Sequence, residues 1–119
     1  MTNALFGNSA AHSDGFRDVD PQTLAAHRGE ARLVDVREPH EFNGELGHIA
    51  EVELVPLATV AAAASAWDRD DEIVLVCRSG GRSAHAARQL VAMGFKHVMN
   101  LRGGMIAYNG AGLPVERAP

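Results

Sequence analysis

The segment from Cys77 to Ser83 carries the residue types in this chain that are best suited to chemistry. It consists of Cys77, Arg78, Ser79, Gly80, Gly81, Arg82 and Ser83, and its cysteine is the only one in the sequence. The two glycines permit positive φ angles, so successive backbone N–H groups can turn inward and form a nest for an anion. A thiol beside such a nest and two arginines should ionise below its usual pKa of about 8.5. The segment therefore predicts a nucleophilic thiolate in an anion-binding loop.

Two elements with strong sequence signals flank this loop. Glu72–Val76 contains four consecutive apolar residues, most of them β-branched, which is typical of a central strand buried on both faces. Ser83–Met93 has the pattern of a helix, and Gly94 is a suitable stop. In open α/β sheets, ligands bind beyond the carboxyl ends of the strands, where a following helix adds free N–H groups and the positive end of its dipole. We therefore expect the loop to lie at the ligand-binding edge of a sheet.

The remaining chain alternates between predicted strands and helices. The predicted strands are 31–36, 52–55 and 97–101, and the predicted helices are 21–27, 39–42, 59–67 and 105–109. This alternation predicts an α/β fold with a central, largely parallel sheet of four or five strands and helices on both faces. Residues 1–16 are polar and aperiodic, so we expect a flexible N-terminal leader followed by one domain over residues 17–119.

Composition and charge exclude several classes of protein. The 119 residues suffice for one domain, and a content of 46% hydrophobic and 22% charged residues excludes a disordered polyelectrolyte. The net charge of −4 argues against a general nucleic-acid binder. Residues 73–115 nevertheless contain five Lys or Arg residues and no Asp or Glu, which creates a local field that can attract a small anion.

Other site types and locations are also disfavoured. A single cysteine excludes an internal disulfide, and the six histidines show no pair at ligand spacing, so we expect no metal site and no cofactor. The sequence has neither a signal peptide nor an apolar segment of membrane-spanning length. We therefore expect a cytoplasmic protein that binds neither nucleic acid nor membranes.

Four landmarks, taken in order, resemble those of the rhodanese-type sulfurtransferases, in particular the single-domain members. They are residues 33–39 (LVDVREP), 47–49 (GHI), the Cys77–Ser83 loop, and 101–104 (LRGG) running to 112–115 (GLPV). The resemblance extends over Val19–Val115 and implies a rhodanese-like three-layer sandwich, in which His48 has a structural, hydrogen-bonded role. Two departures leave the donor and acceptor open: residues 50–52 replace the family's Pro-Gly-Ala, and Tyr108 replaces a tryptophan.

The resemblance implies a reaction and a role for each site residue. Cys77 would accept a sulfane sulfur from a small anionic donor such as thiosulfate, become a persulfide, and pass the sulfur to cyanide or to a thiol acceptor. That acceptor can be a thioredoxin-like or another sulfur-relay protein. The loop N–H groups and arginines would hold the donor and stabilise the persulfide charge. Asp35 resembles the family aspartate near the loop and is expected to pair with Arg82 or a loop N–H, whereas Arg37 and Glu38 are expected in structural ion pairs.

Alternatives from other functional classes remain open. Phosphatases and arsenate reductases of related architecture have five residues between their cysteine and arginine, whereas four residues separate Cys77 from Arg82 here. The shorter loop forms a tighter cradle that suits a single outer sulfur better than a tetrahedral oxyanion. Another alternative is a non-catalytic rhodanese-like module that docks to a partner or carries sulfur inside a larger assembly. The intact cysteine and loop argue against an inactive copy.

Overall fold

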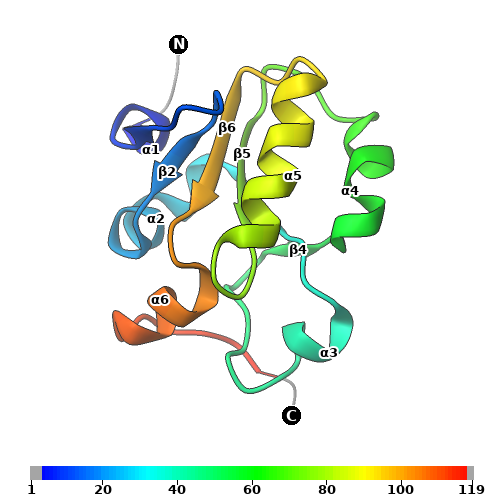
Figure 1. The fold of residues 1–119 in the computed structure, drawn as a ribbon. Coiled ribbons are helices and arrows are strands. Elements are labelled where there is room, and N and C mark those ends of the chain that lie inside the picture. Colours follow the sequence, from blue (N-terminus) through cyan, green and yellow to red (C-terminus); the bar gives the residue numbers. More distant parts are fainter. Residues whose placement is uncertain (1–3, 118–119) are drawn as a thin grey trace.

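A six-stranded sheet runs through the centre of the molecule (Figure 1). The computed structural model describes residues 4–117. The strand order across the sheet is β1 (Ala10–Ala11), β2 (Arg17–Val19), β6 (His97–Leu101), β5 (Glu72–Val76), β3 (Arg32–Asp35) and β4 (Glu53–Leu54). The five strands from β2 to β4 are parallel to their neighbours, and only the two-residue strand β1 pairs antiparallel. The predicted α/β fold is confirmed, with one antiparallel edge strand added to a parallel sheet of the expected size.

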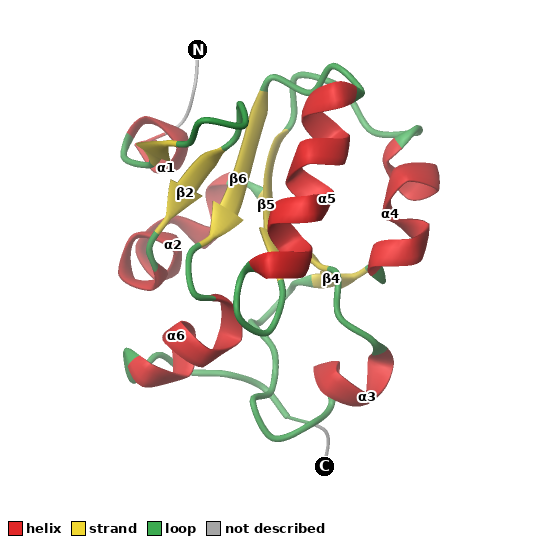
Figure 2. Ribbon diagram, in the orientation of Figure 1, coloured by secondary structure: helices red, strands yellow, loops and turns green. Residues whose placement is uncertain are grey.

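Helices cover both faces of the sheet, which gives three layers (Figure 2). One face packs against α4 (Leu57–Ala64) and α5 (Gly81–Ala92), whose buried side chains belong to the same apolar cluster as those of that face. The other face packs against α1 (Ala4–Gly7), α2 (Pro21–His27) and α6 (Gly104–Gly110). Two short elements complete the fold: the 3-10 turn η1 (Arg28–Glu30) and the single-turn helix α3 (Pro39–Phe42).

Strand β5 lies at the centre of both apolar clusters. Its side chains alternate between the faces, so Ile73 and Leu75 join one cluster and Val74 and Val76 join the other. All four are fully buried, and β3 and β6 pair with β5 on either side. This arrangement is what an uninterrupted apolar run requires, because such a strand must be covered on both faces. Cys77, the residue that follows β5, is therefore anchored to a fully buried strand.

Residues 4–16, within the segment expected to be a flexible leader, contain two short elements. The structure places α1 and β1 there, and the Leu5 side chain is fully buried in the cluster beneath α2 and α6. The Arg17 guanidinium donates to the Ser9 side chain over 2.7 Å and also to the Ser9 carbonyl, which fixes the segment to β2. An isolated leucine produces no periodic signal, so the sequence pattern missed this contact. Residues 4–16 are thus placed against the rest of the domain, and residues 1–3 of the expected leader lie outside the described residues.

None of the helices within residues 4–117 has the length and apolar character needed to cross a membrane.

Candidate active site

The Cys77 thiol lies at the carboxyl end of β5, inside the turn that leads into α5. The residue is only 1% exposed. The backbone N–H of Gly80 donates to Sγ over 3.0 Å, and the Ser83 hydroxyl lies 3.2 Å from the same atom. Gly80 has a φ of +106° and forms the N-cap of α5, so it adopts a conformation that other residues rarely take. The turn therefore directs one backbone N–H and one hydroxyl at the sulfur.

Hydrogen bonds, and not the two arginines, are the main causes that favour the thiolate. Burial raises the pKa of the Cys77 thiol, but hydrogen bonds from the Ser83 side chain and from three backbone N–H groups lower it by more. Those N–H groups belong to Ser79, Gly80 and Ser83. The pKa of the thiol consequently lies below its ordinary value, in the direction predicted from the sequence.

The first turn of α6 forms hydrogen bonds with two carbonyl groups of the loop. The N–H of Met105 donates to the Cys77 carbonyl over 2.8 Å, and the N–H of Ile106 donates to the Arg78 carbonyl over 3.0 Å. Gly104 has a φ of +59°, and a Cβ built on it would lie 2.5 Å from each of those two carbonyl oxygens. The close approach of α6 therefore requires a glycine at this position. The sequence marked the turn before α6 as a family landmark without indicating this contact.

Asn100 is a site residue that the sequence reasoning missed. It lies on β6 beside β5, is 6% exposed, and places Oδ1 2.5 Å from the Ser83 hydroxyl. Its Nδ2 donates to the Gly80 carbonyl over 3.3 Å. Since the Ser83 hydroxyl has one proton, Asn100 and the Cys77 sulfur compete for it. The available signal was a polar residue that interrupts the apolar run of residues 98–101.

The partner expected for Asp35 is wrong. Its carboxylate accepts from the Arg37 guanidinium, with Oδ2 2.8 Å from Nη2, and both side chains are buried at 0% and 1% exposure. The Arg37 guanidinium also donates to the Gly47 carbonyl over 2.7 Å and to the Glu41 carbonyl over 3.2 Å. The structural ion pair expected of Arg37 is confirmed. Asp35 thus orders the segment around α3 and does not contact Arg82 directly.

Arg82 instead forms a bidentate ion pair with Glu41 of α3. Nη1 and Nη2 lie 2.7 Å from Oε1 and Oε2 respectively. The hydrogen bond from Arg82 outweighs partial burial and lowers the pKa of Glu41 to about 2, while the same bond raises the pKa of Arg82. Glu38, expected in an ion pair, forms a capping box with Glu41 at the start of α3. Glu41 was missed because its partner is 41 residues away along the chain.

Arg78, the other loop arginine, is exposed and borders a cavity beside the loop. The cavity has a volume of about 250 Å³ and is lined by His40, Glu41, Gly44, Glu45, Leu46 and Arg78. Within residues 4–117, no carboxylate lies within ion-pair distance of the Arg78 guanidinium. Arg78 is therefore the loop arginine without a carboxylate partner in the part of the chain that the structure describes, and the cavity has room for a small organic group.

The family model of the rhodanese-like domain matches residues 20–111 of the chain. The chain belongs to this family. A protein named sulfurtransferase from Allochromatium vinosum is 35% identical to it over 101 residues, which cover 82% of this chain and 92% of that protein. The thiosulfate sulfurtransferase GlpE of Pseudomonas aeruginosa is 34% identical over 93 residues, 77% of this chain and 83% of that protein. A crystal structure of a rhodanese-related protein from Thermoplasma volcanium superimposes with a TM-score of 0.75 at 26% identity, over 83% of this chain and 96% of that one.

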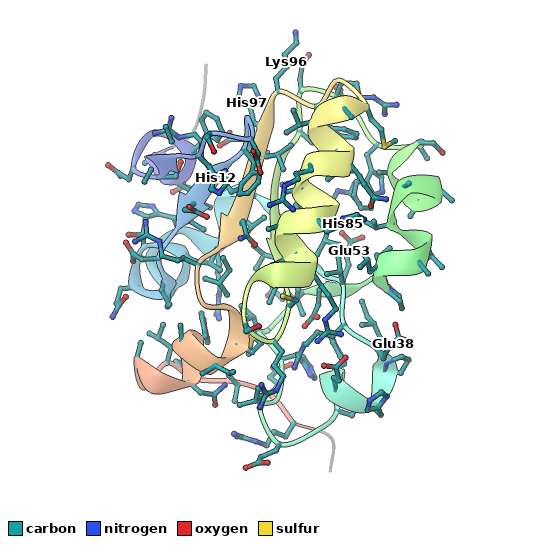
Figure 3. The ribbon with its side chains drawn as sticks, in the orientation of Figure 1. His12, Glu38, Glu53, His85, Lys96 and His97 are labelled. Carbon is teal, nitrogen blue, oxygen red and sulfur yellow. The ribbon has the colours of Figure 1, made fainter. Side chains whose placement is uncertain are left out.

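The histidines of this rhodanese-like domain are dispersed. His48 stacks on Phe42 with 3.8 Å between ring centroids, and its Nδ1 lies 2.9 Å from the Phe42 carbonyl oxygen, so its structural role is confirmed. Figure 3 shows His12, His85 and His97 on the N-terminal segment, α5 and β6 respectively. Among residues 4–117, no three His, Cys, Asp or Glu side chains gather in a group that could hold a metal ion.

Proposed function

We propose that this rhodanese-like domain is a sulfurtransferase that moves a sulfane sulfur through a persulfide on Cys77. The donor is a small anion such as thiosulfate, and the acceptor is cyanide or a thiol, including the thiol of a thioredoxin-like or another sulfur-relay protein. The observation that carries the proposal is the environment of Sγ, where one backbone N–H and one hydroxyl lie within hydrogen-bond distance of a buried thiol. The named sulfurtransferases among its relatives support the same reaction class.

The chemistry divides into two displacements at sulfur. The Cys77 thiolate attacks the outer sulfur of thiosulfate, a new S–S bond forms, and the old S–S bond breaks so that sulfite leaves with its electron pair. The acceptor thiolate or cyanide then attacks the outer sulfur of the persulfide and releases the Cys77 thiolate. The Gly80 N–H and the Ser83 hydroxyl are placed to stabilise negative charge near Sγ in both steps. The chain has no second cysteine, so the acceptor has to be another molecule.

Intact mass spectrometry tests the first displacement. Incubation with thiosulfate is expected to add the mass of one sulfur atom to the protein, and Cys77→Ser is expected to abolish the addition. Multiple turnovers with cyanide or a thiol then separate a transferase from a sulfur-carrying module, which would load once without turning over. An unmodified wild-type protein that hydrolyses an aryl phosphate would refute the sulfurtransferase and favour the phosphatase alternative.

A further inference from the structure

The guanidinium of Arg82 is already occupied in the structure. Both of its terminal nitrogens bind the carboxylate of Glu41 at 2.7 Å. That carboxylate is held in place, because Glu41 Oε1 also accepts the N–H of Glu38 over 3.1 Å and the Glu41 carbonyl accepts from Arg37. A bidentate pair between a guanidinium and a carboxylate fixes the orientation of both groups and also neutralises their charges. Arg82 is thus neutralised by a carboxylate that the fold positions, not by a mobile side chain.

The charges around the cavity beside Arg78 therefore favour a ligand with a low negative charge. Arg78 is the loop cation without a carboxylate partner among residues 4–117. The cavity beside it is also lined by the carboxylates of Glu41 and Glu45. With the Arg82–Glu41 pair neutral, an entering donor meets one further cation, Arg78, and one further carboxylate, Glu45, so a second negative charge on the donor has no cation to match it. The cavity volume of about 250 Å³ leaves space for an organic substituent on the donor.

We propose that Glu41 determines donor selectivity by holding Arg82 away from the donor, so that the site favours sulfane donors with a single negative charge over dianionic thiosulfate. This inference rests on the proposed sulfurtransferase function and names its donor class. The favoured class is an organic thiosulfonate, RSO₂S⁻, or a hydropersulfide, RSS⁻. Glu41 acts through Arg82 and is a positioning residue for specificity.

The transfer from a thiosulfonate balances without any further reactant. The Cys77 thiolate attacks the outer sulfur of RSO₂S⁻, and the S–S bond of the donor breaks. The electron pair leaves with the sulfinate RSO₂⁻, and Cys77 becomes a persulfide anion. No proton, oxidant or reductant is consumed. The step therefore parallels the thiosulfate reaction with one unit less negative charge in both the donor and the leaving group.

Steady-state kinetics with methanethiosulfonate and thiosulfate test the inference, with cyanide as the acceptor. Glu41→Gln removes the charge but keeps an acceptor for the capping box and for Arg82. We expect this variant to raise the kcat/KM for thiosulfate relative to that for methanethiosulfonate by about tenfold, because Arg82 becomes available to the dianion. Glu38→Gln is the matched control: it removes the same charge from the same turn, and Glu38 lies at the start of α3 (Figure 3) without contacting Arg82. The control should leave the ratio unchanged.

Measuring the effect of Glu41→Gln in an Arg82→Ala protein separates an effect on donor selectivity from a general structural effect. In an Arg82→Ala protein, Glu41→Gln should no longer change the ratio of the two kcat/KM values, since the residue it acts through is absent. A ratio in Glu41→Gln equal to that in Glu38→Gln, or equal losses with both donors, would overturn the inference while leaving the proposed function intact. If neither donor forms a persulfide on wild-type Cys77, the proposed function fails, and the inference fails with it.

Discussion

Gly104→Ala is expected to damage both the stability and the active-site loop of the protein. The added Cβ would lie 2.5 Å from the carbonyl oxygens of Cys77 and Arg78 and 2.6 Å from the Arg78 carbonyl carbon. All three are backbone atoms, so no side-chain rotation can relieve the overlap. The φ of +59° is itself unfavourable for alanine. The first turn of α6 must therefore move away from the loop.

The expected loss of stability follows from these contacts. Holding an alanine in the left-handed region costs about 1–2 kcal/mol. If α6 moves, the hydrogen bonds from Met105 to the Cys77 carbonyl and from Ile106 to the Arg78 carbonyl are lost, at a net cost of about 1 kcal/mol each. The free energy of unfolding should fall by roughly 3–4 kcal/mol. Because those carbonyls belong to the Cys77–Ser83 loop, the persulfide formation proposed for Cys77 should slow as well.

Gly110→Ala is the matched control, since it makes the same substitution at the other end of the same helix. A Cβ at Gly110 meets nothing within 4 Å. Alanine is the better helix former, so this variant should be as stable as wild type or up to about 1 kcal/mol more stable. Urea unfolding measures both stabilities, and the rate of sulfur addition from thiosulfate, followed by mass spectrometry, measures the loop. If Gly104→Ala matched Gly110→Ala in both measurements, the role assigned to Gly104 would be refuted.

Three further predictions concern the polar contacts of the site. Ser83→Ala should raise the pKa of Cys77, which is measured by the ultraviolet absorbance of the thiolate against pH. The control Ser79→Ala keeps its backbone N–H and should leave that pKa unchanged. Equal pKa values of Cys77 in the two variants would contradict the role of the Ser83 hydroxyl. Asp35→Asn leaves a buried guanidinium without its carboxylate and should cost about 3–5 kcal/mol in urea unfolding, and a loss below about 1 kcal/mol would contradict that pairing. Glu41 has a folded pKa of about 2 against 4.5 when free, so its ion pair stabilises the fold above pH 4.5 and is lost as the pH falls towards 2. The stability difference between wild type and Glu41→Gln should therefore shrink over that range and stay constant above it.

Local patterns sufficed to predict the centre of the sheet and the turn that follows β5. The apolar run of β5 can be buried only between two covered faces, and the glycines after it permit the positive φ that Gly80 adopts in the turn. Strand β2, which lies between β1 and β6, was missed because Val19 is its one buried residue, and its position depends on backbone pairing with those two strands. Such pairing leaves no periodic pattern of apolar residues.

The polar contacts around the loop could not be predicted because they depend on which side chains the fold brings together. The family resemblance placed Asp35 near the loop and suggested that it pairs with Arg82 or with a loop N–H. In the structure Arg37 takes the carboxylate of Asp35, and Glu41 takes the guanidinium of Arg82. The placement of α3 decides these partners, and a single helical turn has too few residues to fix its own orientation from sequence.

The burial of Cys77 affects how this protein would behave in surveys of reactive cysteines. Its pKa is lowered, yet the residue is only 1% exposed. Reagents used in such surveys carry a reporter group attached to an electrophile, and that bulk must reach the sulfur before any bond can form. Rates of labelling would then report the size of the reagent more than the ionisation of the thiol. A probe that delivers a single sulfur atom is the appropriate reagent for detecting this nucleophile in a cell extract.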